Sequence, residues 1–213
     1  MASTPPYRQI RATYTPDTIT VYQAYKRSIA DAAVKHQKLN ASPEFRPGRM
    51  TWVKPSWSWM MYRAGYSYKD PGQECILALR MKHEHFIALL DKGVLSAHTE
   101  RIGGVGGGEQ GPRHKTSEVR IQWDPERDER LRVLPYRSIQ IGIPGSLSKK
   151  WAEEWIAEIE DVTEKARGLK AALDERADVT RGELLDMGYV PEERVFEVGH
   201  DIRERLGMDL AGS

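Results

Sequence analysis

The sequence predicts an α+β domain with a mixed, mainly antiparallel sheet. Apolar and alternating strand-like segments occur first, separated by short helical stretches. Two further strand-like segments then follow one another without a helix between them, which argues against a purely parallel α/β sheet. After residue 145 the apolar residues take a helical spacing. We therefore expect a domain over residues 10–145 and a helical C-terminal segment, 146–213, packed on it.

Five strands are predicted from β-branched, aromatic and alternating residues. They cover residues 19–25, 50–53, 75–81, 119–123 and 138–143. The third is nearly continuously apolar, so we expect it to lie at the centre of its sheet. Asp124-Pro125 is expected to end the fourth.

Helices are predicted where apolar residues recur every three or four positions. Ser28 is expected to cap a helix that runs towards Leu39, and Ser56 a second helix, 57–64, that Gly65 ends. A third covers 83–91 and ends before Gly93. A further helix is expected because its apolar residues share one face: Trp151, Trp155, Ile156, Ile159 and Val162. Two short helices are expected within residues 179–207.

Composition excludes several classes of protein. The chain has 213 residues, a mean hydropathy of −0.61 and one cysteine, Cys75. No apolar run reaches the roughly 18 residues of a membrane helix. The N-terminal residues lack the apolar core of a secretory signal, and a lone cysteine excludes a disulfide framework or a multi-cysteine zinc site. We expect a reduced, cytoplasmic protein without a membrane partner, and Cys75 as a core thiol.

Charge is unevenly distributed along the chain. Residues 1–145 contain 22 basic and 14 acidic residues, whereas residues 146–213 contain 10 and 17. One interpretation is that the first part meets an anion such as a dinucleotide, a phosphorylated substrate or nucleic acid. The other is that the acidic helices pack on the basic part and the charges cancel.

Three motifs favour structural readings. The glycine loop at 103–111 lacks the Lys-Ser/Thr of a phosphate-binding loop, so we interpret it as a mobile loop or lid. His83 and His85 at a helix start do not face each other, so no metal site is expected. The carboxylates of residues 124–128 are interpreted as a solvated turn, with acid–base catalysis as the alternative.

The segment 49–63 is more informative, because it holds three of the six tryptophans between cations. On a helix from residue 57, Met60, Met61 and Tyr62 cannot all point inward. Aromatic rings here would stack on a base or nicotinamide while Lys54 or Arg63 meets phosphate. The alternative is an aromatic core with snorkelling cations. Arg137 and Gln140, polar residues beside an apolar strand, are also candidates for a site.

Four motifs carry a resemblance to a known family: TVYQAY at 20–25, MTWVKPS through MMYR at 50–63, QWDPERD at 122–128 and PYRSIQIG at 135–142. On these motifs, residues 10–165 resemble an uncharacterised family of bacteria and fungi, the domain of unknown function numbered four-two-nine-one. The order of elements is also similar to that of small ADP-ribosyltransferase domains, including the RNA 2′-phosphotransferase type.

The second resemblance implies an ADP-ribosyltransferase-like fold with an NAD cleft between the first two strands. It implies that Gln23 and Tyr25 contact the nicotinamide ribose and that Trp52 and Tyr62 stack. Gln23 stands where such enzymes have the His or Arg that grips NAD, and Gln140 is nearest to their catalytic Glu. The expected catalytic residues are Gln23 and Gln140. The expected cofactor-binding residues are Tyr25, Trp52, Lys54, Ser56, Tyr62, Arg63 and Arg137.

The resemblance thus implies an NAD-dependent enzyme that transfers ADP-ribose to an acceptor, with nucleic acid as one class of acceptor. The departures from the transferase pattern favour an alternative, a non-catalytic module that binds a nucleotide or RNA through the same surface. A third possibility is an unrelated enzyme that uses the carboxylates at 124–128.

Overall fold

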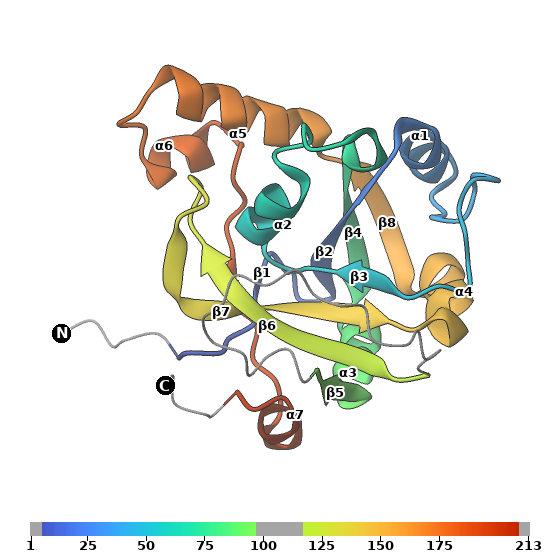
Figure 1. Cartoon of the computed structure of the whole chain (residues 1–213). Helices are drawn as coiled ribbons and strands as arrows, with labels where there is room; N and C mark the ends of the chain where they lie inside the picture. The colour runs from blue at the N-terminus through green and yellow to red at the C-terminus, as the bar shows by residue number, and fades with distance from the viewer. Residues whose placement is uncertain (1–5, 97–116, 209–213) are drawn as a thin grey trace, which may run out of the picture.

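Two β-sheets joined at one point organise the fold (Figure 1). The computed structural model describes residues 6–96 and 117–208. Its strands are β1 (Arg11–Ala12), β2 (Thr18–Tyr25), β3 (Thr51–Val53), β4 (Cys75–Lys82), β5 (Gly93–Leu95), β6 (Val119–Arg127), β7 (Val133–Ile143), β8 (Ile156–Asp161) and β9 (Arg194–Val195). The first sheet has the order β2-β4-β8 and the second β3-β7-β6-β5. An isolated antiparallel bridge between Tyr22 and Lys54 connects them.

The expected fold class, α+β with mainly antiparallel sheets, is confirmed for the described residues. Both sheets are antiparallel except where β5 runs parallel to β6. The helices are short: α1 (Arg27–His36), α2 (Trp57–Ala64), α3 (His83–Asp91), α4 (Ser148–Lys150), α5 (Thr163–Glu175), α6 (Arg181–Asp186) and α7 (His200–Arg205). A π-helical turn, Trp151–Trp155, follows α4.

Strand β4 is buried on both faces, which explains its continuous apolar sequence. Leu77 and Leu79 point into the larger hydrophobic cluster, which also contains Phe86 of α3. Ile76 and Ala78 point into the second cluster, beneath α2 and α5. The predicted central position of this strand in its sheet is therefore confirmed.

The helix expected over residues 151–162 is wrong beyond Trp155, because Ile156–Asp161 forms strand β8. The outer edge of β4 carries main-chain groups that need partners, and β8 supplies them through an antiparallel ladder. Cross-strand ion pairs reinforce it, since Arg80 of β4 binds both Glu158 and Glu160. Trp151, Trp155 and Ile159 are buried as expected, and Ile156 is half-buried.

Three expected boundaries are also wrong. Strand β7 begins at Val133 rather than at residue 138. Helix α1 begins at Arg27 with Lys26 at its N-cap, because the Ser28 hydroxyl donates to the Glu44 carboxylate instead of capping the helix. Strand β6 continues through Asp124-Pro125 to Arg127, since a register shift between Pro125 and Arg127 accommodates the proline. The expected glycine loop lies outside the described residues.

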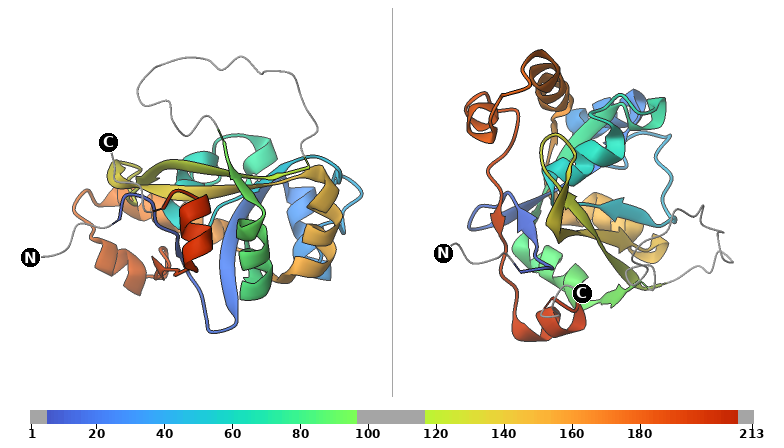
Figure 2. Two further views of the ribbon diagram at one scale, coloured as in Figure 1. Left: turned by 90° about the horizontal axis from the view of Figure 1, so that it is seen from below. Right: turned by 60° about the vertical axis from the view of Figure 1, so that its left-hand side comes forward.

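The segment after residue 145 supplies two strands, β8 and β9, as well as helices, and it spans the molecule. Figure 2 shows α5 and α6 at one end and α7 at the other, with the β9 segment running between them. Strand β9 pairs with β1 on the way. The division of the chain at residue 145 stays a prediction. No helix within the described ranges is long and apolar enough to cross a membrane.

Candidate functional site

A pocket of about 790 Å³ opens where β2 and β3 separate beyond the Tyr22–Lys54 bridge. β2 and β3 belong to different sheets. Beyond the bridge the two strands therefore diverge and leave a wedge-shaped gap instead of continuing a ladder. The walls come from residues 23–26 on and after β2, residues 49–54 around β3, and the first two turns of α2. Gln122 and Gln140 contribute from the second sheet.

Gln23 spans the wedge with its side-chain amide. Its Nε2 donates to Thr51 Oγ1 at 2.7 Å and to the Trp52 carbonyl at 3.0 Å. Its Oε1 accepts from the Tyr25 hydroxyl at 2.8 Å. Burial raises the pKa of Tyr25, so this hydroxyl remains a donor. Gln23 therefore holds the two strands at a fixed separation at the pocket wall.

Lys54 is a buried cation in the same wall, with 5% of its surface exposed. Its ammonium lies 4.7 Å from the ring centroid of Trp59. Within the described ranges, no carboxylate lies within ion-pair distance of it. Burial and the nearby Arg63 lower the pKa of Lys54 to about 8, while Asp124 opposes the shift.

Aromatic and cationic groups surround the cavity. The Trp52 ring packs on Gly142, its partner across the β3–β7 ladder. Arg46, Arg49 and Arg63 also line the pocket. The acid in this lining, Glu44, is bound to Lys26 and accepts from Ser28. The site is therefore net positive, with polar amides and ring faces, a combination suited to a nucleotide.

A row of polar side chains crosses the second sheet at the pocket floor. Gln140 Nε2 donates to Gln122 Oε1 at 2.6 Å across the β6–β7 ladder. Asp124 lies two residues from Gln122 and so shares its face. Its Oδ2 is buried without a hydrogen-bond partner among the described residues. Burial raises the pKa of Asp124, although Lys54 and Arg137 oppose this.

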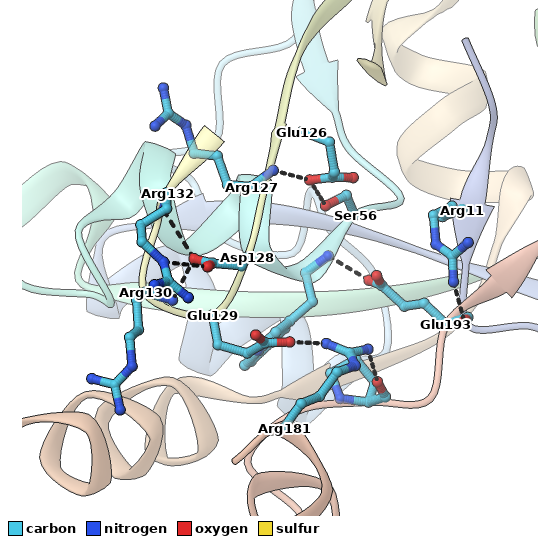
Figure 3. Close-up of polar contacts among 12 residues, drawn as sticks. Arg11, Ser56, Glu126, Arg127, Asp128, Glu129, Arg130, Arg132, Arg181 and Glu193 are labelled. Carbon is cyan, nitrogen blue, oxygen red and sulfur yellow. Dashed lines mark hydrogen bonds and ion pairs between the residues drawn. The ribbon is translucent and has the colours of Figure 1, made fainter. Parts of the chain in front are cut away.

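Beside the pocket, two carboxylates meet the start of α2 (Figure 3). The helix begins as the sequence predicts, with Ser56 Oγ accepting from the Trp59 amide, and it ends at Gly65 in the left-handed conformation. Ser56 Oγ also donates to Glu126 at 2.9 Å. Glu193 accepts from the Trp57 amide at 2.6 Å. The first amides of a helix have no partner within the helix. The carboxyl oxygen of Glu193 and the Ser56 hydroxyl held by Glu126 supply such partners, so these contacts position α2 against the pocket.

Six of the nine expected site residues line the pocket: Gln23, Gln140, Tyr25, Trp52, Lys54 and Arg63. Ser56, Tyr62 and Arg137 lie outside its lining. Ser56 is buried in the cap of α2. Tyr62 is exposed and packs beneath the Arg127 guanidinium, 3.6 Å from its ring centroid. Arg137 donates to the Tyr7 hydroxyl at 2.8 Å.

Sequence reasoning missed residues 44–46, Gln122 and the burial of Asp124. Residues 44–46 contain Arg46 but lie in a stretch that reads as a loop, between Pro43 and Pro47. Gln122 was detectable, because it alternates with buried Ile121 and Trp123 and therefore had to share one sheet face with Asp124. The carboxylates at 124–128 do not form a simple solvated turn: Glu126 is 4% exposed, whereas Asp128 bonds Arg130 and Arg132 in the turn.

The remaining chemical motifs have structural surroundings. His85 stacks on Trp155, and His83 packs edge-on against Phe196. Cys75 is buried, and burial raises the pKa of its thiol to about 11. Across residues 6–96 and 117–208, no group of three His, Cys, Asp or Glu residues is placed to hold a metal ion.

Comparison with known proteins places the chain in one family. A family model described as a domain of unknown function (DUF4291) matches residues 9–196. The chain therefore belongs to this uncharacterised family, as its four motifs predict. A search of curated proteins finds no match.

Proposed function

We propose that this protein binds NAD in the pocket between β2 and β3 and transfers its ADP-ribose group to an acceptor, with nucleic acid as one class of acceptor. The observation that carries the proposal is the composition of this pocket, in which ring faces, amides and arginines surround one cavity at the split between two sheets. Among the described residues, these arginines have no ion-pair partner. The order of elements, similar to that of ADP-ribosyltransferase domains, supports it.

Each expected contact follows from the chemistry of NAD. Arg63, with Arg46 and Arg49, meets the pyrophosphate, because a guanidinium matches two phosphate oxygens at once. Trp52 offers a ring face for a base or for nicotinamide. Gln23 has used both amide hydrogens within the protein, so it meets the nicotinamide ribose through its oxygen, together with Tyr25.

In this proposal the bond between nicotinamide and ribose breaks with positive charge developing on the sugar. Nicotinamide leaves with the bonding electron pair, and the acceptor oxygen or nitrogen forms the new bond at the same carbon. The protein contributes positioning and charge stabilisation. Gln140 and Gln122 line the pocket, and Asp124 follows Gln122 on the same face of β6, outside that lining.

One observation favours a second function, a non-catalytic module that binds a nucleotide or RNA. The acidic residue of the pocket lining, Glu44, is already bound to Lys26 and Ser28. The position expected for a catalytic glutamate holds Gln140, whose amide is bound to Gln122. Such a site retains the groups that bind a nucleotide, but it lacks a free acidic group beside the bond to be cleaved in the described lining.

Two measurements on the same samples separate these functions. Calorimetry gives the affinity for NAD, and mass spectrometry detects release of nicotinamide in the presence of RNA or DNA. Binding with release supports the transferase. Binding of NAD or of RNA without release supports the binding module, and no binding of NAD, nucleotides or RNA rejects both.

Matched arginine variants test the location of the site. Arg63→Ala should weaken nucleotide binding roughly tenfold, because it removes a charge-assisted contact. Arg137→Ala removes the same side chain outside the pocket and should leave affinity unchanged. Equal losses in both variants at unchanged melting temperature would place the anion site elsewhere.

A further inference from the structure

Lys54 has surroundings that simple anion binding does not require. The side chain is buried and lines the pocket, its ammonium packs on the Trp59 ring, and it has no carboxylate partner within ion-pair distance in the described part of the chain. Other pocket cations contrast with it: Lys26 is bound to Glu44, and the three arginines already supply charge for phosphate. A desolvated lysine beside another cation is the environment that makes an amine nucleophilic.

The electrostatics agree with this geometry. Burial and Arg63 of α2 lower the pKa of Lys54 to about 8, against the influence of Asp124 from β6. An exposed lysine has a pKa of about 10.4. Near neutral pH, Lys54 thus presents a far larger fraction of the free amine than lysines on the surface.

We propose that Lys54 is a covalent binding site whose amine condenses with the aldehyde group of a phosphorylated ligand to form an imine. Arg46, Arg49 and Arg63 supply the phosphate contacts in the same cavity. The class of ligand is a phosphorylated aldehyde, and the open-chain form of ADP-ribose belongs to it. The inference uses the pocket of the proposed function but does not require NAD to be turned over.

The reaction balances without an oxidant or reductant. The amine nitrogen attacks the carbonyl carbon, and the carbonyl oxygen takes up a proton. The resulting carbinolamine loses that oxygen as water, leaving a carbon–nitrogen double bond. Asp124 is placed to serve the proton transfer, because it interacts with the Lys54 charge and its buried Oδ2 has no other described partner.

Reductive trapping tests the proposal on the full chain. The protein is incubated with pyridoxal 5′-phosphate or with ADP-ribose at about pH 7.5, then treated with borohydride and mapped by peptide mass spectrometry. We expect Lys54 to be labelled roughly tenfold faster or more than exposed lysines, because a larger fraction of its side chain is free amine. Adenosine diphosphate should protect it by occupying the pocket.

Variants and a pH profile complete the test. Lys54→Arg keeps the charge and removes the amine, so the adduct should disappear. Lys82→Arg, at an exposed site on β4, should leave it unchanged. In the unmodified chain, the trapping rate should rise with a midpoint of about pH 8, a measurement independent of whether the variant folds. Labelling of surface lysines ahead of Lys54, or a midpoint above about pH 10, overturns the proposal.

The outcome is distinguishable from failure of the proposed function. Trapping at Lys54 without nicotinamide release sustains this inference and rejects the transferase. Nicotinamide release without any adduct at Lys54 rejects the covalent site and sustains the transferase.

Discussion

Glu193 connects the end of the chain to the helix that borders the pocket. Its carboxylate accepts a hydrogen bond from the Trp57 amide at the start of α2. The Arg11 guanidinium binds the Glu193 carbonyl at 3.1 Å (Figure 3). Burial, and then the charge of Glu126, raise the pKa of Glu193 to about 8. The two carboxyl groups therefore share the helix terminus with at most one charge favoured near neutral pH.

This shift predicts that stability falls as pH rises. The folded state keeps the Glu193 proton up to about pH 8, whereas the unfolded chain loses it near the ordinary pKa of 4.5. The free energy of unfolding therefore decreases as pH rises across that window. Glu193→Gln keeps the acceptor oxygen and removes the ionisation. Its melting temperature should match that of the original chain at about pH 5 and exceed it by several degrees at about pH 8. Parallel pH curves for the two proteins would contradict the shift.

Single residues were predictable where the signal is local. Ser56 and Gly65 bound α2 as expected, because a helix cap depends on neighbours within one turn. The contact of Glu126 was not predictable, because its partner Ser56 lies 70 residues away. The burial of Glu126 also depends on β6 continuing through Pro125. The site residues stay predictions. Arg137 lies outside the pocket lining and bonds Tyr7, a partner 130 residues distant that no local pattern indicates.

At the scale of elements, the β3–β7 ladder shapes one wall of the site. Trp52 pairs with Gly142, and a Cβ atom added at Gly142 would lie 3.0 Å from the indole ring. Glycine is therefore the residue that lets the ring lie flat on the sheet, and the orientation of the pocket wall depends on it.

Gly142→Ala should push the Trp52 ring into the cavity. We expect nucleotide affinity to fall roughly tenfold while stability changes by about 1–2 kcal/mol or less, because the ring has the pocket to move into. Calorimetry and thermal melting measure the two effects. Gly182→Ala is the matched control, since its Cβ would meet only the Thr180 hydroxyl at 3.9 Å. Unchanged affinity in Gly142→Ala would mean that Trp52 does not border the ligand.

The strand β8 shows why some elements escape sequence reasoning. Trp151, Trp155 and Ile159 recur every four residues, so they fit a helix as well as the observed turn and strand. The open edge of β4 decides between them, and that edge exists only in the folded molecule. Strands and helices whose patterns are unambiguous, such as β2, β4 and α3, were predicted within a residue or two.

At the scale of the whole molecule, the acidic segment partly neutralises the basic one. Arg27 binds Asp161 at 3.4 Å, and Arg80 binds Glu160 at 2.7 Å. These pairs support the interpretation in which charges cancel between the two parts of the sequence. The arginines lining the pocket take no part in such pairs within the described residues. The other interpretation, in which the basic part meets an anion, stays a prediction for that part of the molecule.

Removing residues 146–213 should therefore destroy the fold. The truncation deletes β8 from the first sheet and the buried rings of Trp151 and Trp155 from the core. We expect aggregation or a molten product that binds a hydrophobic dye, because the edge and apolar surface of β4 become exposed. A soluble fragment 1–145 with a sharp thermal transition would show that the first part folds alone.

The bridge between the two sheets fixes the backbone position of a pocket residue. Tyr22 and Lys54 exchange two main-chain hydrogen bonds, of 2.7 and 3.3 Å, so Lys54 is anchored to both sheets at once. Gln23 ties the same two strands together at the pocket wall, through Thr51 Oγ1 and the Trp52 carbonyl. In the proposed imine reaction, the ligand's aldehyde would therefore meet an amine whose main chain is held from two sides, and the ligand would have to fit the distance between that amine and the arginines.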